Sequence, residues 1–276
     1  MQNLWKSYRY LFMRRVVQVG LLVLYFGANA WGWKVLQGNL SSSLIFGVIP
    51  MSDPYAMLQM LAAGAVLATD LLIGVGVATA FYFFIGGRAF CSWVCPINMV
   101  TDLADFIREL IGMNRLTGVK QPASRNIRYW VLGMSLVVSA IMGVAAFEFL
   151  SPISMMHRGI VFGIGFGWAA VLIIFLFDLF ILKNGWCGHI CPLGGFYSLL
   201  GKFSLIRVKY NEENCTLCMK CKVVCPESQV LFMVGKESLS VLSGECTNCA
   251  RCIEVCDDDA LGFSLVSLIQ NKKIGE

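Results

Sequence analysis

The stretch CTLCMKCKVVCP at residues 215–226 holds four cysteines with the spacing Cys-x2-Cys-x2-Cys-x3-Cys. The same spacing occurs again in CTNCARCIEVCD at residues 246–257. Gaps of two residues let a tight loop direct three thiolates to one side, whereas a gap of three directs the fourth thiolate elsewhere. Two such runs so close together predict a small domain that folds around bound metal.

This pair of runs has the spacing of bacterial ferredoxins, in which three cysteines of a run hold one [4Fe–4S] cluster and the fourth holds the other. By that rule, the ligands of the first predicted cluster are Cys215, Cys218, Cys221 and Cys256. The ligands of the second are Cys246, Cys249, Cys252 and Cys225. Soft thiolates favour iron–sulfur clusters, although Cys-x2-Cys pairs also bind zinc. Asp257–Asp259 place negative charge beside Cys256, which predicts that the first cluster is harder to reduce than the second.

The rest of the chain has the composition of a membrane protein. Of its 276 residues, 57% are hydrophobic and only 14% are charged, whereas soluble domains are about 25% charged. A helix needs about 20 apolar residues to cross a bilayer. Four runs meet that length: Val16–Leu36, Met57–Gly87, Ile127–Leu150 and Ile160–Leu182. The basic residues flank these runs and form no groove-sized patch, which excludes nucleic acid as an expected partner.

The distribution of lysine and arginine predicts the orientation of these runs. Basic residues precede the first run, follow the fourth and lie between the second and third, where they include Arg115 and Lys120. The segment 37–56 has none. Positive residues stay inside, so both termini are predicted to be cytoplasmic in a multi-pass protein of the bacterial inner membrane. The alternative, a signal peptide cleaved after Ala28–Ala30, fits less well because the apolar run continues through Trp33.

A second cysteine motif occurs twice. FCSWVCPIN at 90–98 and GWCGHICPLGG at 185–195 each contain Cys-x3-Cys-Pro, and each follows an apolar run. On a helix, residues i and i+4 share one face, and proline suits the start of the next helix. We therefore expect a third metal or redox site, tuned by His189, from Cys91, Cys95, Cys187 and Cys191. A redox-active pair of dithiols, or cysteines that merely pack as small hydrophobes, are the alternatives.

These patterns predict three segments. Residues 1–15 form a basic N-terminus. Residues 16–200 form a four-helix transmembrane domain of two parallel helix-pair repeats. Residues 201–276 form a small α+β ferredoxin-like domain with two [4Fe–4S] clusters.

With these motifs, and with QGNLSSSLIFGVIPMSDP at 37–54, essentially the whole chain resembles the NapH family. That family is the ferredoxin-type membrane subunit of quinol dehydrogenases that serve periplasmic nitrate reductase. The resemblance implies oxidation of menaquinol or ubiquinol from the quinone pool. It also implies a NapG-like periplasmic partner with four iron–sulfur clusters, and indirectly nitrate reductase and its cytochromes. Since the predicted tail is cytoplasmic, either the Cys-x3-Cys-Pro centre passes electrons across the membrane or the tail serves another step.

Oxidation of quinol also needs a proton acceptor near a redox centre. Asp178 is the best-placed ionisable residue, about 13 Å from Cys187 if the helix is continuous. An ion pair with Lys183 or Arg88 is the structural alternative. His157 is expected in solvent on an outer loop. Two other functions remain open: a metal-handling reductase for copper or iron at the Cys-x3-Cys-Pro motifs, and a passive membrane anchor for a soluble iron–sulfur protein.

Overall fold

The computed structural model describes residues 2–112, 124–163, 165 and 167–265. Arg115, Lys120 and the last part of the predicted ferredoxin domain, residues 266–276, lie outside this range. The chain divides into two compact units. The segments of the first, which we call the cysteine-rich unit, are Met1–Val17, Phe81–Val94 and Tyr197–Glu276. The segments of the second, the helical unit, are Gln18–Ala80 and Cys95–Phe196.

Only one described helix is long and apolar enough to cross a membrane. It is α1 (Gln2–Trp31), with its apolar part at Tyr8–Trp31. Three further apolar helices are shorter: α3 (Thr69–Ile85), α6 (Ile127–Met142) and α9 (Gly167–Phe180). The chain is mostly helical, as predicted, but four continuous spans are not confirmed.

Each of the last three predicted runs is divided into two helices. The additional helices are α2 (Pro54–Ala62), α7 (Ala146–Leu150) and α8 (Pro152–Phe162). At each division stands a glycine with positive φ: Gly64 at 79°, Gly143 at 68° and Gly163 at 111°. Glycine adopts this backbone conformation without a steric penalty and commonly ends helices. A count of apolar residues does not detect these breaks.

The predicted outer connection at 37–56 contains a small antiparallel sheet, which the sequence did not predict. Its strands are β1 (Leu36–Gly38), β2 (Ser42–Ile45) and β3 (Ile49–Ser52), in the order β1-β2-β3. The Asn39 side chain accepts hydrogen bonds from the backbone N–H groups of Ser41 and Ser42, both at 2.9 Å, and so forms the first turn. Asp53 then caps α2 by accepting from Tyr55 N.

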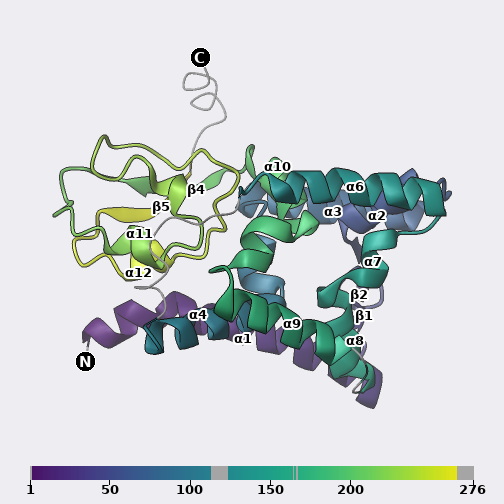
Figure 1. Ribbon diagram of the computed structural model, residues 1–276. Helices are drawn as coiled ribbons and strands as arrows, with labels where there is room; N and C mark the ends of the chain where they lie inside the picture. Colours follow the sequence, from purple (N-terminus) through teal and green to yellow (C-terminus); the bar gives the residue numbers. More distant parts are fainter. Residues whose placement is uncertain (1, 113–123, 164, 166, 266–276) are drawn as a thin grey trace. The chain divides into compact units, whose positions relative to one another are not determined.

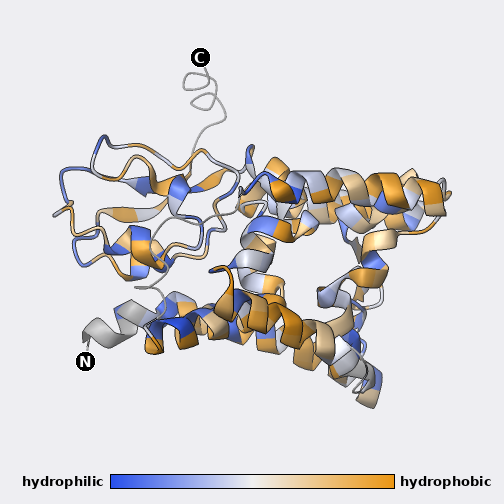
Figure 2. Cartoon of the chain, viewed as in Figure 1, coloured by the Kyte–Doolittle hydropathy of each residue, from blue (hydrophilic) through white to orange (hydrophobic). Residues whose placement is uncertain are grey.

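Within the helical unit, α9 packs against α8 and against α4 (Ile97–Leu110), and α2 packs against α6. Figure 2 shows α6 and α9 as almost continuously hydrophobic. Many of their apolar side chains face outward, since Trp130 and Ile141 of α6 are 75% and 78% exposed, and Ile173 of α9 is 66% exposed. These helices therefore have apolar surfaces that the protein itself does not cover.

The cysteine-rich unit contains a small α+β fold (Figure 1). Strands β4 (Ile206–Tyr210) and β5 (Leu261–Leu265) pair antiparallel. The short helices are α11 (Lys220–Val224), η3 (Ser228–Leu231) and α12 (Arg251–Glu254). The strands and helices of this unit enclose a core of buried apolar side chains, which includes Val208, Tyr210, Val230, Leu231, Met233, Val234, Val241, Ile253, Ala260 and Leu261. The predicted domain bounds 201–276 stay a prediction, because the compact unit that contains both cysteine runs also includes residues from two earlier parts of the chain.

Glycine and arginine pack these separate segments tightly. A Cβ atom on Gly87 would lie 2.0 Å from Tyr197 O, and one on Gly244 would lie 2.0 Å from Ser198 O. Tyr197 and Ser198 belong to the end of α10 (Pro192–Gly201). The backbone at Gly87 and the backbone at Gly244 therefore both lie directly against this helix, with no side chain between. Beside it, the buried guanidinium of Arg207 donates to the carbonyls of Gly201, Lys202, Ser204, Val241 and Leu242. Arg207 thus joins α10 to the loop that leads into the second cysteine run.

Candidate functional site

The first candidate site is a pocket in the cysteine-rich unit. Four cysteines line it: Cys215, Cys218, Cys221 and Cys256. Cys215 and Cys218 lie in the loop before α11, and Cys221 lies in its first turn. Cys256 lies two residues after the end of α12. Apolar side chains complete the wall, among them Val234, Val255 and Leu261. These are the four cysteines that the spacing assigns to one cluster.

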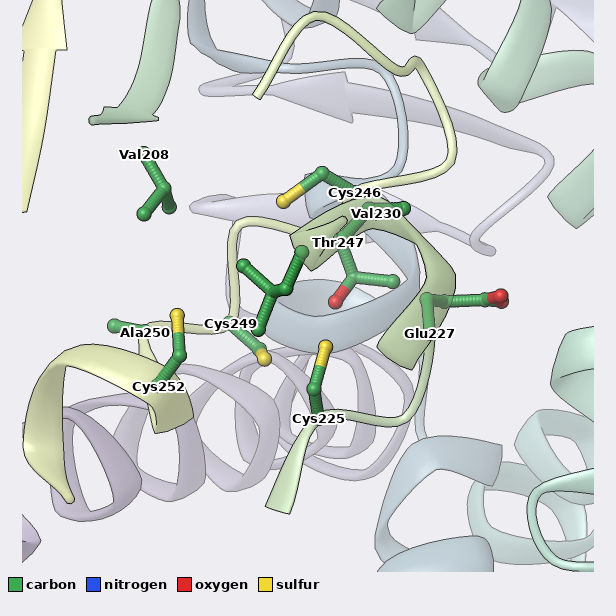
Figure 3. A pocket seen from close by; sticks show the side chains of 10 residues that line it. Val208, Cys225, Glu227, Val230, Cys246, Thr247, Cys249, Ala250 and Cys252 are labelled. Atoms are coloured by element: carbon green, nitrogen blue, oxygen red, sulfur yellow. The ribbon is translucent and has the colours of Figure 1, made fainter. Parts of the chain in front are cut away.

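The second candidate site has the complementary composition. Its cysteines are Cys225, Cys246, Cys249 and Cys252. Figure 3 shows their sulfur atoms directed toward a common space, while the carboxylate of Glu227 points away from it. Cys225, which follows α11, is the last cysteine of the first run, and the other three belong to the second run. Each run therefore contributes three thiolates to one pocket and one thiolate to the other.

The two pockets fit a cluster better than a single ion. Four cysteines and several apolar side chains line each pocket, which suits two copies of one group. Four thiolates around one zinc ion would all lie about 2.3 Å from it. Figure 3 instead shows the four sulfur atoms of the second pocket spread around a common space. Sulfur atoms spread around a space match a cubane, which has to fit between them.

The backbone of both cysteine loops has an unusual conformation that the sequence did not predict. Leu217 and Met219 in the first loop have φ of 58°, and the equivalent Asn248 and Ala250 in the second have φ of 49° and 63°. Residues with a side chain rarely adopt positive φ. Residues with this conformation occur in anion-binding nests, in which successive N–H groups turn to one side, as at iron–sulfur sites. In the first loop, Leu217 N donates to Cys215 Sγ at 3.4 Å.

Burial controls the protonation of the second set of thiols. It raises the pKa of Cys246 to about 11, and the positive charges of Arg207 and Arg88 offset only part of this effect. Burial also raises the pKa of Cys252 well above its ordinary value. Without metal these thiols are protonated at pH 7, so ligand binding at this site must release protons.

The three aspartates beside Cys256 are largely paired. Asp257 forms an ion pair with Lys220 at 2.9 Å, and Asp259 forms one with Lys6 at 2.7 Å. Asp258 accepts from Thr216 N and Thr216 Oγ1, which lowers its pKa. The lysines reduce the net negative charge on which the predicted difference in cluster reduction depends, and that difference stays a prediction.

Both Cys-x3-Cys-Pro motifs form π-helices, not the α-helical turn that the sequence predicted. The turns are Phe90–Val94 and Trp186–Ile190, and the motif's second cysteine directly follows each turn. The turns are thus π-helical and not α-helical, since a π-turn closes i→i+5 hydrogen bonds, as Cys191 N to Trp186 O does at 2.9 Å. That the two cysteines of each motif point together stays a prediction. The expected role of proline is confirmed: Pro96 caps α4 and Pro192 begins α10.

The thiols of these motifs differ in exposure. Cys95 and Cys191 are buried, whereas Cys91 and Cys187 are partly exposed. Cys91 belongs to the cysteine-rich unit and the other three belong to the helical unit. Convergence of the four into one centre stays a prediction.

Asp178 lies in α9 and is buried, with 1% of its surface exposed. Neither ion pair considered for it forms, because Lys183 pairs with Asp105 and Arg88 pairs with Glu227. Instead, Asp178 Oδ1 accepts from Trp186 N at 2.9 Å. The chain turns back after α9, so this carboxylate lies next to the motif and not a helix length away from it. Its other oxygen, Oδ2, has no hydrogen-bond partner among the described residues.

Both histidines are buried, at 1% exposure. The expectation that His157 lies in solvent is wrong, because its position in α8 places it edge-on against the ring of Tyr25, with centroids 4.8 Å apart. His189 lies inside the second π-turn. An apolar environment of this kind cannot be read from the neighbouring Arg158 in the sequence.

The comparisons with known proteins agree with this description. A model of 4Fe–4S binding domains matches residues 67–114 and again 162–211, so each match contains one Cys-x3-Cys-Pro motif. The two matches support the predicted internal repeat. A model of 4Fe–4S dicluster domains matches residues 207–257, which contain both ferredoxin-type runs. The chain is thus a ferredoxin-type iron–sulfur protein. No solved structure matches it.

Curated relatives extend the similarity to nearly the whole chain. The ferredoxin-type protein NapH of Escherichia coli is 40% identical over 259 residues, which cover 92% of this chain and 89% of that protein. The methylamine utilization ferredoxin-type protein MauN of Methylorubrum extorquens is 40% identical over 258 residues, covering 92% and 88%. NapH of Haemophilus influenzae is 41% identical over 266 residues, covering 94% and 91%. The chain belongs to the NapH/MauN family of ferredoxin-type electron-transfer proteins, as the sequence motifs indicated.

Proposed function

We propose that this protein is the membrane subunit of a quinol dehydrogenase. In this role it oxidises menaquinol or ubiquinol and passes the electrons through iron–sulfur clusters, one at a time. The observation that carries the proposal is the pair of four-cysteine pockets with crossed ligand sets. Thiolates in this arrangement would hold two [4Fe–4S] clusters, which supply one-electron redox chemistry.

The helical unit supports a membrane location. Exposed apolar side chains on α6 and α9, such as Trp130, Ile141 and Ile173, would each be unfavourable in water at about 25 cal/mol per Å² of apolar surface. Lipid would cover these surfaces. We propose four membrane-inserted helical segments with cytoplasmic termini, the last three of them broken at glycines and not continuous.

The residues around Asp178 support a site for quinol oxidation. Its carboxylate is the only ionisable side chain in α9, and its free Oδ2 can accept a proton. Its Oδ1 is bonded to the backbone N–H that precedes Cys187. We propose that Asp178 accepts a proton of quinol while an electron enters the redox centre formed by Cys91, Cys95, Cys187 and Cys191.

The resemblance to NapH supports a proposal for the partners. We propose a NapG-like periplasmic protein with four clusters as a partner, and periplasmic nitrate reductase with its cytochromes as the indirect, final destination. MauN relatives are as similar as NapH relatives, so the acceptor protein is best identified by co-purification. Nothing in the structure or the relatives favours the metal-handling reductase.

The test is quinol-driven reduction of the clusters. Protein in proteoliposomes would be mixed anaerobically with menaquinol and followed by EPR and visible absorption. We expect the clusters to be reduced. If dithionite reduces them and menaquinol and ubiquinol do not, the proposed function is wrong.

A further inference from the structure

The second cysteine loop, residues 246–249, is attached to the segment that surrounds Cys91. Ser92 Oγ donates to Thr247 O at 2.7 Å, and Trp93 Nε1 donates to Asn248 O at 3.1 Å. In the other direction, Asn248 Nδ2 donates to Ile85 O at 2.9 Å. Residues 85–93 thus form hydrogen bonds with the carbonyl groups of Thr247 and Asn248 and with the Asn248 side chain.

Buried charge strengthens the same attachment. Arg88 Nη1 donates to Glu245 O, immediately before Cys246, at 2.9 Å. The same nitrogen contacts Glu227 Oε1 at 2.5 Å, two residues after Cys225. Arg88 therefore contacts residues that are close in sequence to Cys225 and Cys246, two of the four cysteines that line this pocket.

The first cysteine loop, the equivalent loop of the other pocket, is open. Leu217 and Met219 there are 54% and 38% exposed, whereas the equivalent Asn248 and Ala250 are 6% and 1% exposed. Cys218 is exposed, whereas its equivalent Cys249 is buried. Two loops with the same cysteine spacing and backbone conformation thus have opposite surroundings: one is covered by residues 85–93 and the other faces solvent.

We infer that the two clusters act in a fixed order. Cys225, Cys246, Cys249 and Cys252 would hold the inner cluster, which would receive electrons from the centre at Cys91. Cys215, Cys218, Cys221 and Cys256 would hold the outer cluster, from which the electrons would leave the protein. One bonded route runs from Cys91 to Ser92, across one hydrogen bond to Thr247, and on to Cys246. This inference rests on the proposed function and adds direction to it.

The redox balance is simple. One quinol becomes quinone with loss of two electrons and two protons. The two cysteine sets would hold one-electron acceptors, so the two electrons would pass singly. Asp178 accepts one of the two protons, and the other is released to water at the quinol site.

Removal of one cluster at a time tests the order. Cys218→Ala removes an outer ligand and Cys249→Ala removes the equivalent inner ligand. In proteoliposomes with menaquinol, the inner cluster of Cys218→Ala should be reduced as in the wild type, and the outer cluster of Cys249→Ala should no longer be reduced. Dithionite must reduce the remaining cluster in both variants, which shows that it is intact. Equal or reversed behaviour overturns the order, whereas a wild type that menaquinol does not reduce overturns the proposed function instead.

A second measurement does not depend on quinol. Ser92→Ala and Trp93→Phe remove single donors to loop 246–249, and Thr216→Val removes the equivalent hydroxyl contact in the first loop, that with Asp258. Hydrogen bonds near the thiolates tune cluster potentials. In dithionite-poised titrations followed by EPR, Ser92→Ala and Trp93→Phe should shift only the inner signal, and Thr216→Val only the outer. If Ser92→Ala and Trp93→Phe shift the outer signal alone, or neither signal, residues 85–93 do not contact the inner cluster.

Discussion

Arg88 and Glu227 form an ion pair 139 residues apart in sequence, with 1% and 3% of their side chains exposed. Glu227 also accepts from Gln229, which in turn donates to Glu245. The pair therefore belongs to a hydrogen-bonded group that joins the segment after the first cysteine run to the segment before the second. A buried charge of this kind is costly to leave without its partner.

We expect Glu227→Gln to destabilise the protein strongly. The substitution keeps the size of the side chain and leaves the Arg88 guanidinium buried without a counter-charge, at a cost of about 3–5 kcal/mol. The measurement is the temperature at which cluster absorption is lost in detergent. The matched control is Lys6→Met, which breaks the exposed pair with Asp259 and should cost at most about 1 kcal/mol. Equal effects of the two substitutions would show that Arg88–Glu227 is not buried.

Gly244→Ala should prevent the second cysteine run from packing on α10. The new Cβ would lie 2.0 Å from Ser198 O and 2.7 Å from Lys202 N, and both are backbone atoms that cannot move aside alone. We expect low iron content and a marked loss of thermal stability. Gly262→Ala is the control, because nothing lies within 4 Å of its added Cβ. Normal iron content in Gly244→Ala would contradict the close approach.

The crossed ligand sets give a sharp prediction for pairs of cysteines. Cys225→Ala should give the EPR phenotype of Cys249→Ala, from the other run, and not that of Cys221→Ala, its neighbour in the same run. Each variant should retain about half of the iron held by the tail. If phenotypes instead group by run, each run holds its own cluster and the crossed arrangement is wrong.

Asp178→Asn should slow quinol-driven reduction of the clusters by about 10²–10⁴-fold, the usual contribution of a general base. Reduction by dithionite should be unchanged, because the substitution lies outside the cysteine-rich unit. Asp70→Asn provides the control, since Asp70 begins α3 at an exposed position. Full quinol activity in Asp178→Asn would remove Asp178 from the site.

The spacing of cysteines predicts the composition of both pockets because ligand geometry is local: gaps of two and three residues determine which thiolates can meet. The repeat of Cys-x3-Cys-Pro is equally visible, and the same family model matches both copies. The backbone at these motifs is not predictable in this way. A π-turn differs from an α-turn by one residue per hydrogen bond, and residue type does not distinguish them strongly.

Contacts between distant segments also have no local signal. Ser92 and Thr247 are 155 residues apart, and nothing near either residue indicates the other. Arg88 was an expected partner for Asp178 because both lie near predicted span ends, but Glu227 pairs with it instead. The glycines that end helices inside apolar runs were hidden for a different reason, since glycine is common in membrane helices.

Because loop 246–249 is hydrogen-bonded to residues 85–93, we expect that residues 201–276 do not fold correctly on their own. A fragment that begins at residue 201 would lack Ile85 and Arg88, so the Asn248 amide would lose an acceptor and the Glu227 carboxylate would lose the Arg88 charge. Synthesis proceeds from the N-terminus, so residues 85–93 have already been made when the last cysteines emerge. Loop 246–249 can therefore fold directly against residues 85–93, which belong to the first half of the chain.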